Sequence, residues 1–423
     1  MSRIKTPSIH ILLAVGLLVG LSLKGQAQPP DVRSEVTNYD ESKVVQYVLP
    51  DPLVMRDGRA VTSEALWRSE RRSELLELFE TQVYGRRLPA PKAIKFHLVE
   101  TLHGAIHGQA TRKRIRIELP GDGDKTASLL ITLFVPTRAA KPVPAFVGMH
   151  LFDTSADEPV PGKPLVLDVG EKLPGAELMQ TILQRGYAIA TLDAKDFCPD
   201  DKATFREGVL EALYSQQMGP PGPEESGAIG TWAWGLSRAL DYLETDRDVD
   251  AHKVAVIGHS RMGKTALWAG AEDTRFALVI SNNSGCGGAA LSRRNFGETV
   301  GRITRVFPHW FCGNFSKYAL EEDSLPVDQH ELIALIAPRP VYIASAEEDR
   351  WADPKGEFLA AVAADPVYRL LGKPGLEATG PELPPVGKSI GKTIGYHIRV
   401  GKHALTDYDW LRYLNFADLQ FGK

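Results

Sequence analysis

Short apolar segments alternate with longer amphipathic segments through most of this 423-residue chain. Eight segments are predicted strands because they are rich in valine, isoleucine, leucine and alanine. They are residues 114–119, 128–135, 145–150, 187–194, 253–258, 277–283, 339–345 and 395–401. Several are apolar at nearly every position, which is typical of parallel strands covered on both faces.

Helical patterns lie before and between these segments. Residues 63–85 have apolar side chains at helical spacing, with Ser63 as the expected N-cap and Gly85 as the expected end. Residues 234–245 place three leucines on one helix face. The alternation predicts an α/β fold with a doubly wound, mostly parallel sheet and helices on both faces.

The N-terminus has the features of a secretory signal. Arg3 and Lys5 precede an apolar run of about a dozen residues with a small-x-small end. That run is shorter than the roughly 20 residues that span a bilayer. We expect removal of residues 1–27, a polar leader over 28–60, a main domain over 61–423, and a secreted or periplasmic location.

Charge and cysteine content limit the binding partners, disulfides and metal sites that the chain can have. Without residues 1–27, which carry three basic residues and no acid, 46 basic and 53 acidic residues remain, a net charge of −7. This balance argues against a nucleic-acid partner. Cys198, Cys286 and Cys312 allow one disulfide at most, or three buried thiols. Zinc-type ligand spacings are absent from the sequence, so no metal is predicted.

The stretch "GHSRMGK", residues 258–264, places a serine between a predicted strand and a predicted helix. Ligands of doubly wound sheets bind beyond the carboxyl ends of the strands, where Ser260 stands. The setting is that of a nucleophile elbow, whose usual form is G-x-S-x-G. Here the second glycine, Gly263, comes one residue late. A serine that merely caps the helix is the alternative.

A nucleophilic serine needs a base that is held by a third group. In α/β-hydrolases the order along the chain is Ser…Asp/Glu…His. Glu347, Glu348 and Asp349 follow the next-to-last predicted strand, and His403 follows the last one. A solvated acidic cluster and a surface histidine are the alternatives for each group alone, but the order and both placements together favour a catalytic set.

The remaining histidines near these elements have less specific settings. His259 adjoins the serine, and we expect its side chain to point away from Ser260 across the turn. His150 follows a strand at the edge where the pocket is expected. His309 and His330 are expected to be core or loop residues.

"GHSRMGK" resembles the G-x-S-R-x-G-K signature of glucuronoyl esterases, carbohydrate esterase family 15 of the bacterial type. The resemblance covers nearly all of residues 48–417. It includes "RRSELLELFETQVYGR", "GAIGTWAWGLSRALDYLETD", "SGCGGAALSRRNFGETV", "FPHWF", "LPVDQHELIALIAPRP", "DRWADPKGEF" and "GKHALTDYDW". It implies a cofactor-free α/β-hydrolase, expected as a monomer, that hydrolyses the ester between glucuronic acid of xylan and lignin alcohols.

The resemblance also implies site residues. Ser260 corresponds to the nucleophile and His403 to the base. The backbone N–H and guanidinium of Arg261 would face the oxyanion. Lys264 and Glu298 would bind uronate hydroxyls.

Trp351 would bind the same sugar and offer an apolar face to its ring. Some family members carry the acid just before "SG-x-GG", where this chain has Asn283, which has no carboxylate. Asp349 matches the other family location of the acid, with Glu348 as the fallback.

Two other functions remain open from the sequence. An acetyl-xylan or cephalosporin-type deacetylase shares the fold and the order of the triad, but an acetyl group would leave Lys264 and Glu298 without a purpose. A non-catalytic carbohydrate-binding protein on a hydrolase scaffold is the alternative from another class. An intact Ser/His/Asp set argues against it.

Overall fold

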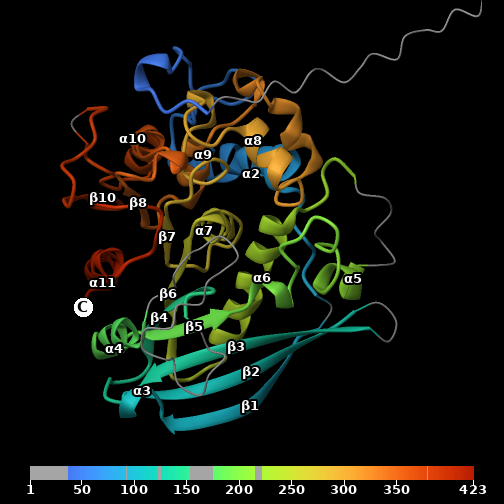
Figure 1. Cartoon of the computed structure of the whole chain (residues 1–423), viewed down its shortest axis with the longest axis vertical. Coiled ribbons are helices and arrows are strands. Elements are labelled where there is room, and N and C mark those ends of the chain that lie inside the picture. The colour runs from blue at the N-terminus through green and yellow to red at the C-terminus, as the bar shows by residue number, and fades with distance from the viewer. Residues whose placement is uncertain (1–36, 92, 122–124, 153–174, 215–221, 379) are drawn as a thin grey trace, which may run out of the picture. The chain divides into compact units, whose positions relative to one another are not determined.

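The computed structural model describes residues 37–91, 93–121, 125–152, 175–214, 222–378 and 380–423. These residues form one ten-stranded sheet with helices on both faces (Figure 1). The strands are β1 (Lys95–Gly104), β2 (Ala110–Pro120), β3 (Thr126–Pro136), β4 (Val143–Met149), β5 (Ala188–Leu192), β6 (Val249–His259), β7 (Leu278–Asn282), β8 (Val341–Ala346), β9 (Ser389–Gly391) and β10 (Ile394–Arg399). The α-helices are α1 (Glu64–Leu66), α2 (Arg72–Phe79), α3 (Ala105–Gly108), α4 (Ala176–Gln184), α5 (Val209–Tyr214), α6 (Ala228–Leu243), α7 (Arg261–Glu272), α8 (Val300–Val306), α9 (Gln329–Ile336), α10 (Pro354–Leu370) and α11 (Asp407–Phe421).

The strand order is β1-β2-β3-β5-β4-β6-β7-β8-β10-β9. From β5 to β10 every neighbouring pair is parallel. The pairs among β1, β2, β3 and β5 are antiparallel, as is the pair of β9 with β10. The predicted doubly wound sheet is therefore confirmed, with antiparallel strands added at both edges.

The two faces of the sheet bury different clusters of side chains. Val254 and Val256 of β6 point into the cluster that includes residues of α2, α6, α7, α9 and α10. Ala255 and Ile257 point into the cluster with α4 and α11. Since successive strand residues face opposite sides, an apolar residue is needed at every position, which explains the continuous apolar runs.

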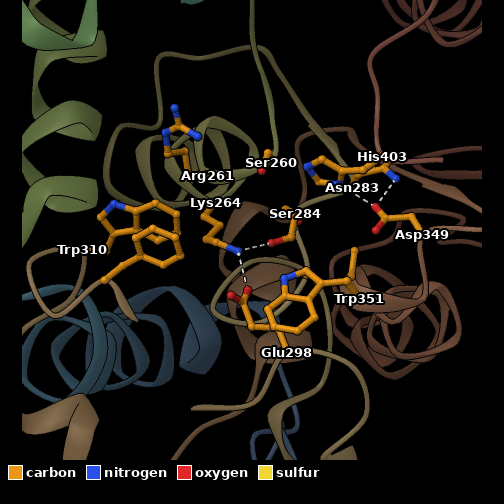
Figure 2. A pocket seen from close by; sticks show the side chains of 13 residues that line it. Ser260, Arg261, Lys264, Asn283, Ser284, Glu298, Trp310, Asp349, Trp351 and His403 are labelled. Atoms are coloured by element: carbon orange, nitrogen blue, oxygen red, sulfur yellow. Dashed lines mark hydrogen bonds and ion pairs between the residues drawn. The ribbon is translucent and has the colours of Figure 1, made fainter. Parts of the chain in front are cut away.

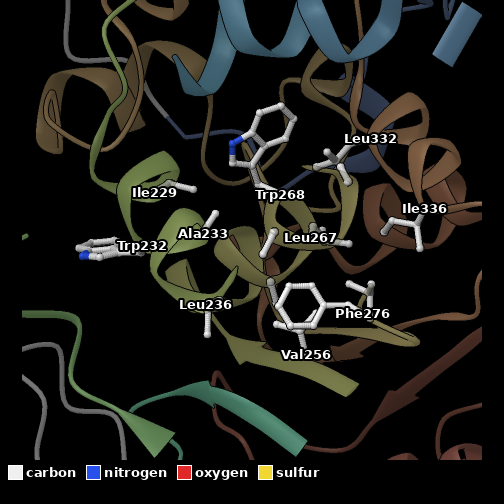
Figure 3. Close-up of a cluster of buried hydrophobic side chains, with 14 of the residues drawn as sticks. Ile229, Trp232, Ala233, Leu236, Val256, Leu267, Trp268, Phe276, Leu332 and Ile336 are labelled. Carbon is white, nitrogen blue, oxygen red and sulfur yellow. The ribbon is translucent and has the colours of Figure 1, made fainter. Parts of the chain in front are cut away.

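The larger cluster fixes the helix that follows Ser260. Trp268 and Leu267 of α7 are completely buried between α6, α9 and the sheet (Figure 3). Trp232 and Leu236 of α6 belong to the same cluster. Full burial of a leucine side chain such as that of Leu267 or Leu236 stabilises the fold by roughly 1.5–3 kcal/mol. The helix is thus held firmly where it meets the turn after β6.

The eight predicted strands are all present, while β1 and β9 were not predicted. Strand β1 lies at the sheet edge and none of its ten residues is buried. Its apolar residues Phe96, Leu98, Val99 and Leu102 do not alternate regularly, and its register shifts between Leu98 and Glu100. Strand β9 has only three residues. The predicted helix 63–85 runs from Glu64 to Tyr84 with two π-helical stretches, is capped by Ser63, and ends at Gly85 with a φ of 96°.

The predicted signal segment, 1–27, lies outside the described residues. From residue 37 onward, the predicted leader belongs to the same compact unit as the rest of the chain. Cys198, Cys286 and Cys312 are buried free thiols. None of the helices in the described part of the chain is long and apolar enough to cross a bilayer.

Candidate active site

Ser260 stands on a strained turn between β6 and α7. Its φ of 56° and ψ of −127° lie outside the regions that non-glycine residues prefer. A Cβ on Gly258 would lie 1.9 Å from the backbone oxygen of Met262, so only glycine fits there. Such strain costs on the order of 1–3 kcal/mol and persists where the surroundings impose it. The turn has the geometry of a nucleophile elbow.

The packing around Gly263 explains why the second glycine of the motif stands at this position. A Cβ at this position would lie 3.0 Å from Cβ of Ser284 and 3.1 Å from Oγ of Ser281. The first turn of α7 therefore packs closely on the end of β7 and the loop that follows. In this chain the close approach falls three residues after the serine instead of two.

His403 and Asp349 meet behind the serine. Nδ1 of His403 lies 2.6 Å from Oδ2 of Asp349. Figure 2 shows Ser260, His403 and Asp349 in that order along one side of the pocket. Burial would raise the pKa of Asp349, but the hydrogen bond and charge of His403, with a further bond from Asn283, hold that pKa below its ordinary value. The carboxylate is thus ionised and oriented toward the imidazole.

Asp349 and its neighbour Glu348 leave β8 in different directions. Asp349 is buried, whereas Glu347 and Glu348 are exposed and do not line the pocket. Asn283, at the alternative position for the acid, donates from Nδ2 to Oδ2 of Asp349 over 2.6 Å. The structure therefore pairs Asp349, and not Glu348, with His403.

Residues from four adjacent strands meet at this point. Ser260 follows β6, Asn283 follows β7, Asp349 follows β8 and His403 follows β10, and these strands are neighbours in the sheet. Parallel strands bring their carboxyl ends to one edge, where ligands of doubly wound sheets bind.

His259 packs against the candidate base. Its ring centroid is 4.5 Å from that of His403, and its Nδ1 is 2.5 Å from Oδ1 of Asn282. This contact with His403 was not predicted from the sequence. His150, which we expected at the pocket, accepts a hydrogen bond from the backbone N–H of Ala194 and is not among the pocket residues. His330 is buried and contacts the backbone oxygen of Pro50.

The guanidinium of Arg261 is held on one side of the pocket by Asp200. Nε of Arg261 lies 2.8 Å from Oδ2 of Asp200. The other oxygen of Asp200 accepts from Nε1 of Trp310 at 2.6 Å and lies 2.8 Å from Nε2 of His309. Burial would raise the pKa of Asp200, but His309, Arg261 and Trp310 together lower it. Asp200 was missed in the sequence analysis, and His309 was expected to be a core or loop residue without this role.

A buried lysine and glutamate lie next to the serine. Nζ of Lys264 donates to the backbone oxygen of Ser284 and lies 3.8 Å from Oε2 of Glu298 (Figure 2). Burial raises the pKa of Glu298, although the charge of Lys264 opposes the rise. The backbone N–H of Glu298 donates to the oxygen of Trp351 over 2.9 Å. The pair presents both charge and hydrogen-bonding capacity to a polar ligand.

Aromatic rings enclose the pocket on two sides. Trp310 and Trp351 lie across the pocket from each other, with Lys264 and Glu298 between them (Figure 2). The rings of Phe307 and Trp310 are stacked, with centroids 3.8 Å apart. Such faces suit the apolar side of a sugar ring or an aromatic group. In the sequence analysis Phe307 and Trp310 appear only within the segment "FPHWF", and no role was predicted for them.

All seven predicted site residues line one pocket of about 330 Å³. They are Ser260, Arg261, Lys264, Glu298, Asp349, Trp351 and His403. The other lining residues are Asn283, Ser284, Gly285, Phe307, Trp310 and Ala352. Within the described ranges, no group of three or more His, Cys, Asp or Glu side chains is placed to hold a metal ion.

The sheet order, the serine on its turn and the histidine–carboxylate pair define an α/β-hydrolase. A family model described as "Glucuronyl esterase, fungi" matches residues 120–372. The chain is 45% identical over 410 residues to carbohydrate esterase MZ0003 of an unknown prokaryotic organism, covering 92% of this chain and 94% of that protein. This protein belongs to the glucuronoyl esterase family, carbohydrate esterase family 15.

Two further relatives agree with this assignment. The chain is similar to a glucuronoyl esterase structure from Solibacter usitatus, with a TM-score of 0.82 and 41% identity over 90% of this chain and 100% of that one. It is 29% identical to 4-O-methyl-glucuronoyl methylesterase 1 of Wolfiporia cocos, over 84% of this chain and 81% of that protein.

Proposed function

We propose that this protein hydrolyses the ester bond between (4-O-methyl-)glucuronic acid of glucuronoxylan and lignin alcohols. The observation that carries the proposal is the buried Lys264–Glu298 pair in the same pocket as Ser260. A uronate ester has its carbonyl on C6 and ring hydroxyls beside it. A lysine one helical turn from the serine can donate to those hydroxyls without reaching the acyl carbon.

In the proposed mechanism, Oγ of Ser260 forms a bond to the ester carbonyl carbon while His403 accepts the hydroxyl proton. Asp349 orients the imidazole and stabilises its charged form. The tetrahedral intermediate collapses, the alcohol leaves with the proton from His403, and the glucuronoyl group stays on Ser260. Water then repeats the sequence and releases the acid.

The developing oxyanion lies next to positive charge. The N–H of Arg261 belongs to the first turn of α7, whose dipole favours negative charge there. The guanidinium of Arg261 adds a fixed charge, with Asp200 setting its position. In a water-poor site each such group contributes a few kcal/mol, about 2.7–4 for a well-placed donor.

Turnover of benzyl glucuronate compared with acetylated xylan tests the substrate class. We expect release of benzyl alcohol by the purified protein and little release of acetate. Ser260→Ala is expected to lower turnover about 10³-fold or more, while the thermal midpoint stays close to that of the parent. Preferential deacetylation would favour the deacetylase, and binding of the sugar without turnover of any ester would favour a carbohydrate-binding protein.

We further propose export of the chain as a monomer, with residues 1–27 removed, a leader over 28–60 and a catalytic domain over 61–423. The basic start and short apolar run support removal of the signal. Mass spectrometry of protein from the periplasm or medium is expected to show a mature N-terminus at Gln28. Protein that keeps Met1 in the cytoplasm would contradict this proposal.

A further inference from the structure

Segment 38–41, which the sequence analysis places in the leader, contacts the two loops that carry Glu298 and Trp351. The backbone oxygen of Asn38 accepts a hydrogen bond from the N–H of Gly297 over 2.9 Å. The next residue, Glu298, donates its own N–H to Trp351 over 2.9 Å. Three stretches that are distant in the sequence are therefore joined at Gly297, Glu298 and Trp351, the last two of which are expected to bind the sugar.

Tyr39 strengthens this junction through its ring. The rings of Tyr39 and Phe296 meet edge to face, with centroids 6.2 Å apart. The guanidinium of Arg350 lies 5.5 Å from the Tyr39 ring and 5.8 Å from the Phe296 ring. Phe296 lies two residues before Glu298, and Arg350 directly precedes Trp351. Tyr39 thus contacts both loops close to their functional side chains.

Glu41 connects the segment to the buried ion pair of Arg294 and Asp353. Its carboxylate accepts from Nη2 of Arg294 at 2.6 Å and lies 3.6 Å from Nζ of Lys355. Nε of Arg294 also pairs with Asp353 at 2.8 Å, and both side chains are only 3% exposed. Asp353 caps the N-terminus of α10. An ion pair with one buried partner loses less to solvent screening than a pair at the surface.

The loop that carries Glu298 fits tightly at this junction. Gly297 has a φ of 66°, and a Cβ there would lie 2.4 Å from the backbone oxygen of Trp351. The backbones of the two loops are therefore in direct contact, with Asn38 bonded to the same glycine. A shift of one loop is expected to move the other.

We infer that segment 38–41 positions Glu298 and Trp351 and so determines the specificity of the site for uronate esters. As a statement about substrate, this inference rests on the proposed function. Tyr39 and Glu41 act through the two loops and are positioning residues without contact to the reacting atoms.

The test compares Tyr39→Ala/Glu41→Ala with the control Lys43→Ala in the full mature chain. Lys43 lies two residues after the segment, and its side chain is 73% exposed, with Nζ 3.6 Å from Oδ2 of Asp40. Amide hydrogen exchange of Gly297 and Glu298 is measured together with kcat and KM on benzyl glucuronate and on 4-nitrophenyl acetate. Lys264→Ala gives the reference for loss of a direct uronate contact.

We expect the double variant to exchange both amides about tenfold faster and to have a KM for benzyl glucuronate raised about five- to tenfold. Its turnover of 4-nitrophenyl acetate should stay within about twofold of the parent, since that ester needs only the triad. Lys43→Ala should match the parent in every measurement.

Unchanged exchange at Gly297 and Glu298 would overturn the inference, as would equal losses on both esters. If the double variant fails to fold, Glu41→Gln, which keeps the shape and removes the charge, must show the same changes to a smaller degree. If the parent does not hydrolyse benzyl glucuronate, the proposed function fails, while the exchange measurement still decides whether the segment holds the two loops.

Discussion

Oδ2 of Asp349 accepts two hydrogen bonds, one from Nδ1 of His403 and one from Nδ2 of Asn283, each over 2.6 Å. A single oxygen with two donors leaves the carboxylate one favourable orientation. Asn283, at the other position that the family resemblance implies for the acid, thus supports the proposed acid Asp349 on the next strand. In this arrangement Asp349 would serve as the acid, and Asn283 would hold its carboxylate in place.

Asp349→Asn is expected to lower turnover of glucuronate esters by several hundred-fold or more. The new amide must place its NH₂ group against Asn283 or against His403, so it either loses a bond or imposes the wrong imidazole tautomer. Glu348→Gln, one residue away and exposed, is the matched control and should cost less than about tenfold. Steady-state kinetics of both variants checks the ranking, and the reverse order would move the acid to Glu348.

Which site residues could be predicted from the sequence depended on their order along the chain. Asp349 and His403 could be predicted because each follows a strand, in the order that α/β-hydrolases use. Asp200 and Trp310 could not, because each comes from a loop whose path no local pattern determines. Glu298, far from any strand end, was predicted only through the resemblance to the family.

The strand-turn-helix unit of β6 and α7 works as one element. Its helix is anchored by Trp268 in the core, and its turn has no room for a side chain at Gly258. The apolar pattern predicted both the strand and the helix, but the strained φ of Ser260 follows from how they pack. Edge strand β1 was missed for the opposite reason, since none of its side chains is buried and its apolar residues do not alternate regularly.

Gly258→Ala is expected to lower turnover at least about 100-fold and to destabilise the fold by about 1–3 kcal/mol. The added Cβ would lie 1.9 Å from the oxygen of Met262, so the first turn of α7 must move away from the strand. Gly175→Ala is the control, because a Cβ there meets no atom of the described residues within 4 Å and its φ is −86°. Urea unfolding and kinetics of both variants provide the check. Parent-like activity of Gly258→Ala would mean that the turn is not rigid.

The core of the protein holds acidic groups that take part in no step of the proposed reaction. Glu272 at the end of α7 is buried, with 7% of its surface exposed, and burial raises its pKa to about 8 despite the nearby charge of Arg87. Within the described residues, its Oε1 has no hydrogen-bond partner. Glu357 is also buried with a raised pKa of about 7, but its oxygens accept from Ser284, Gly285 and Ser345. The two glutamates thus differ in whether the fold compensates their charge.

Glu272 is therefore expected to make the stability of the protein fall as the pH rises. Its pKa in the folded chain, about 8, lies above the ordinary value of 4.5, so the folded state keeps a proton that the unfolded state has lost. The favourable contribution is complete below about pH 4.5 and is lost as the pH rises through about 8. Glu272→Gln removes this dependence, so the variant should gain roughly 2.7 kcal/mol over the parent between pH 6 and pH 9, because the two pH units from 6 to 8 count about 1.4 kcal/mol each. Urea unfolding at both pH values measures the gain, with exposed Glu382→Gln as the control that should show none. An equal difference between Glu272→Gln and the parent at both pH values would mean that Glu272 is already ionised in the folded protein at pH 6.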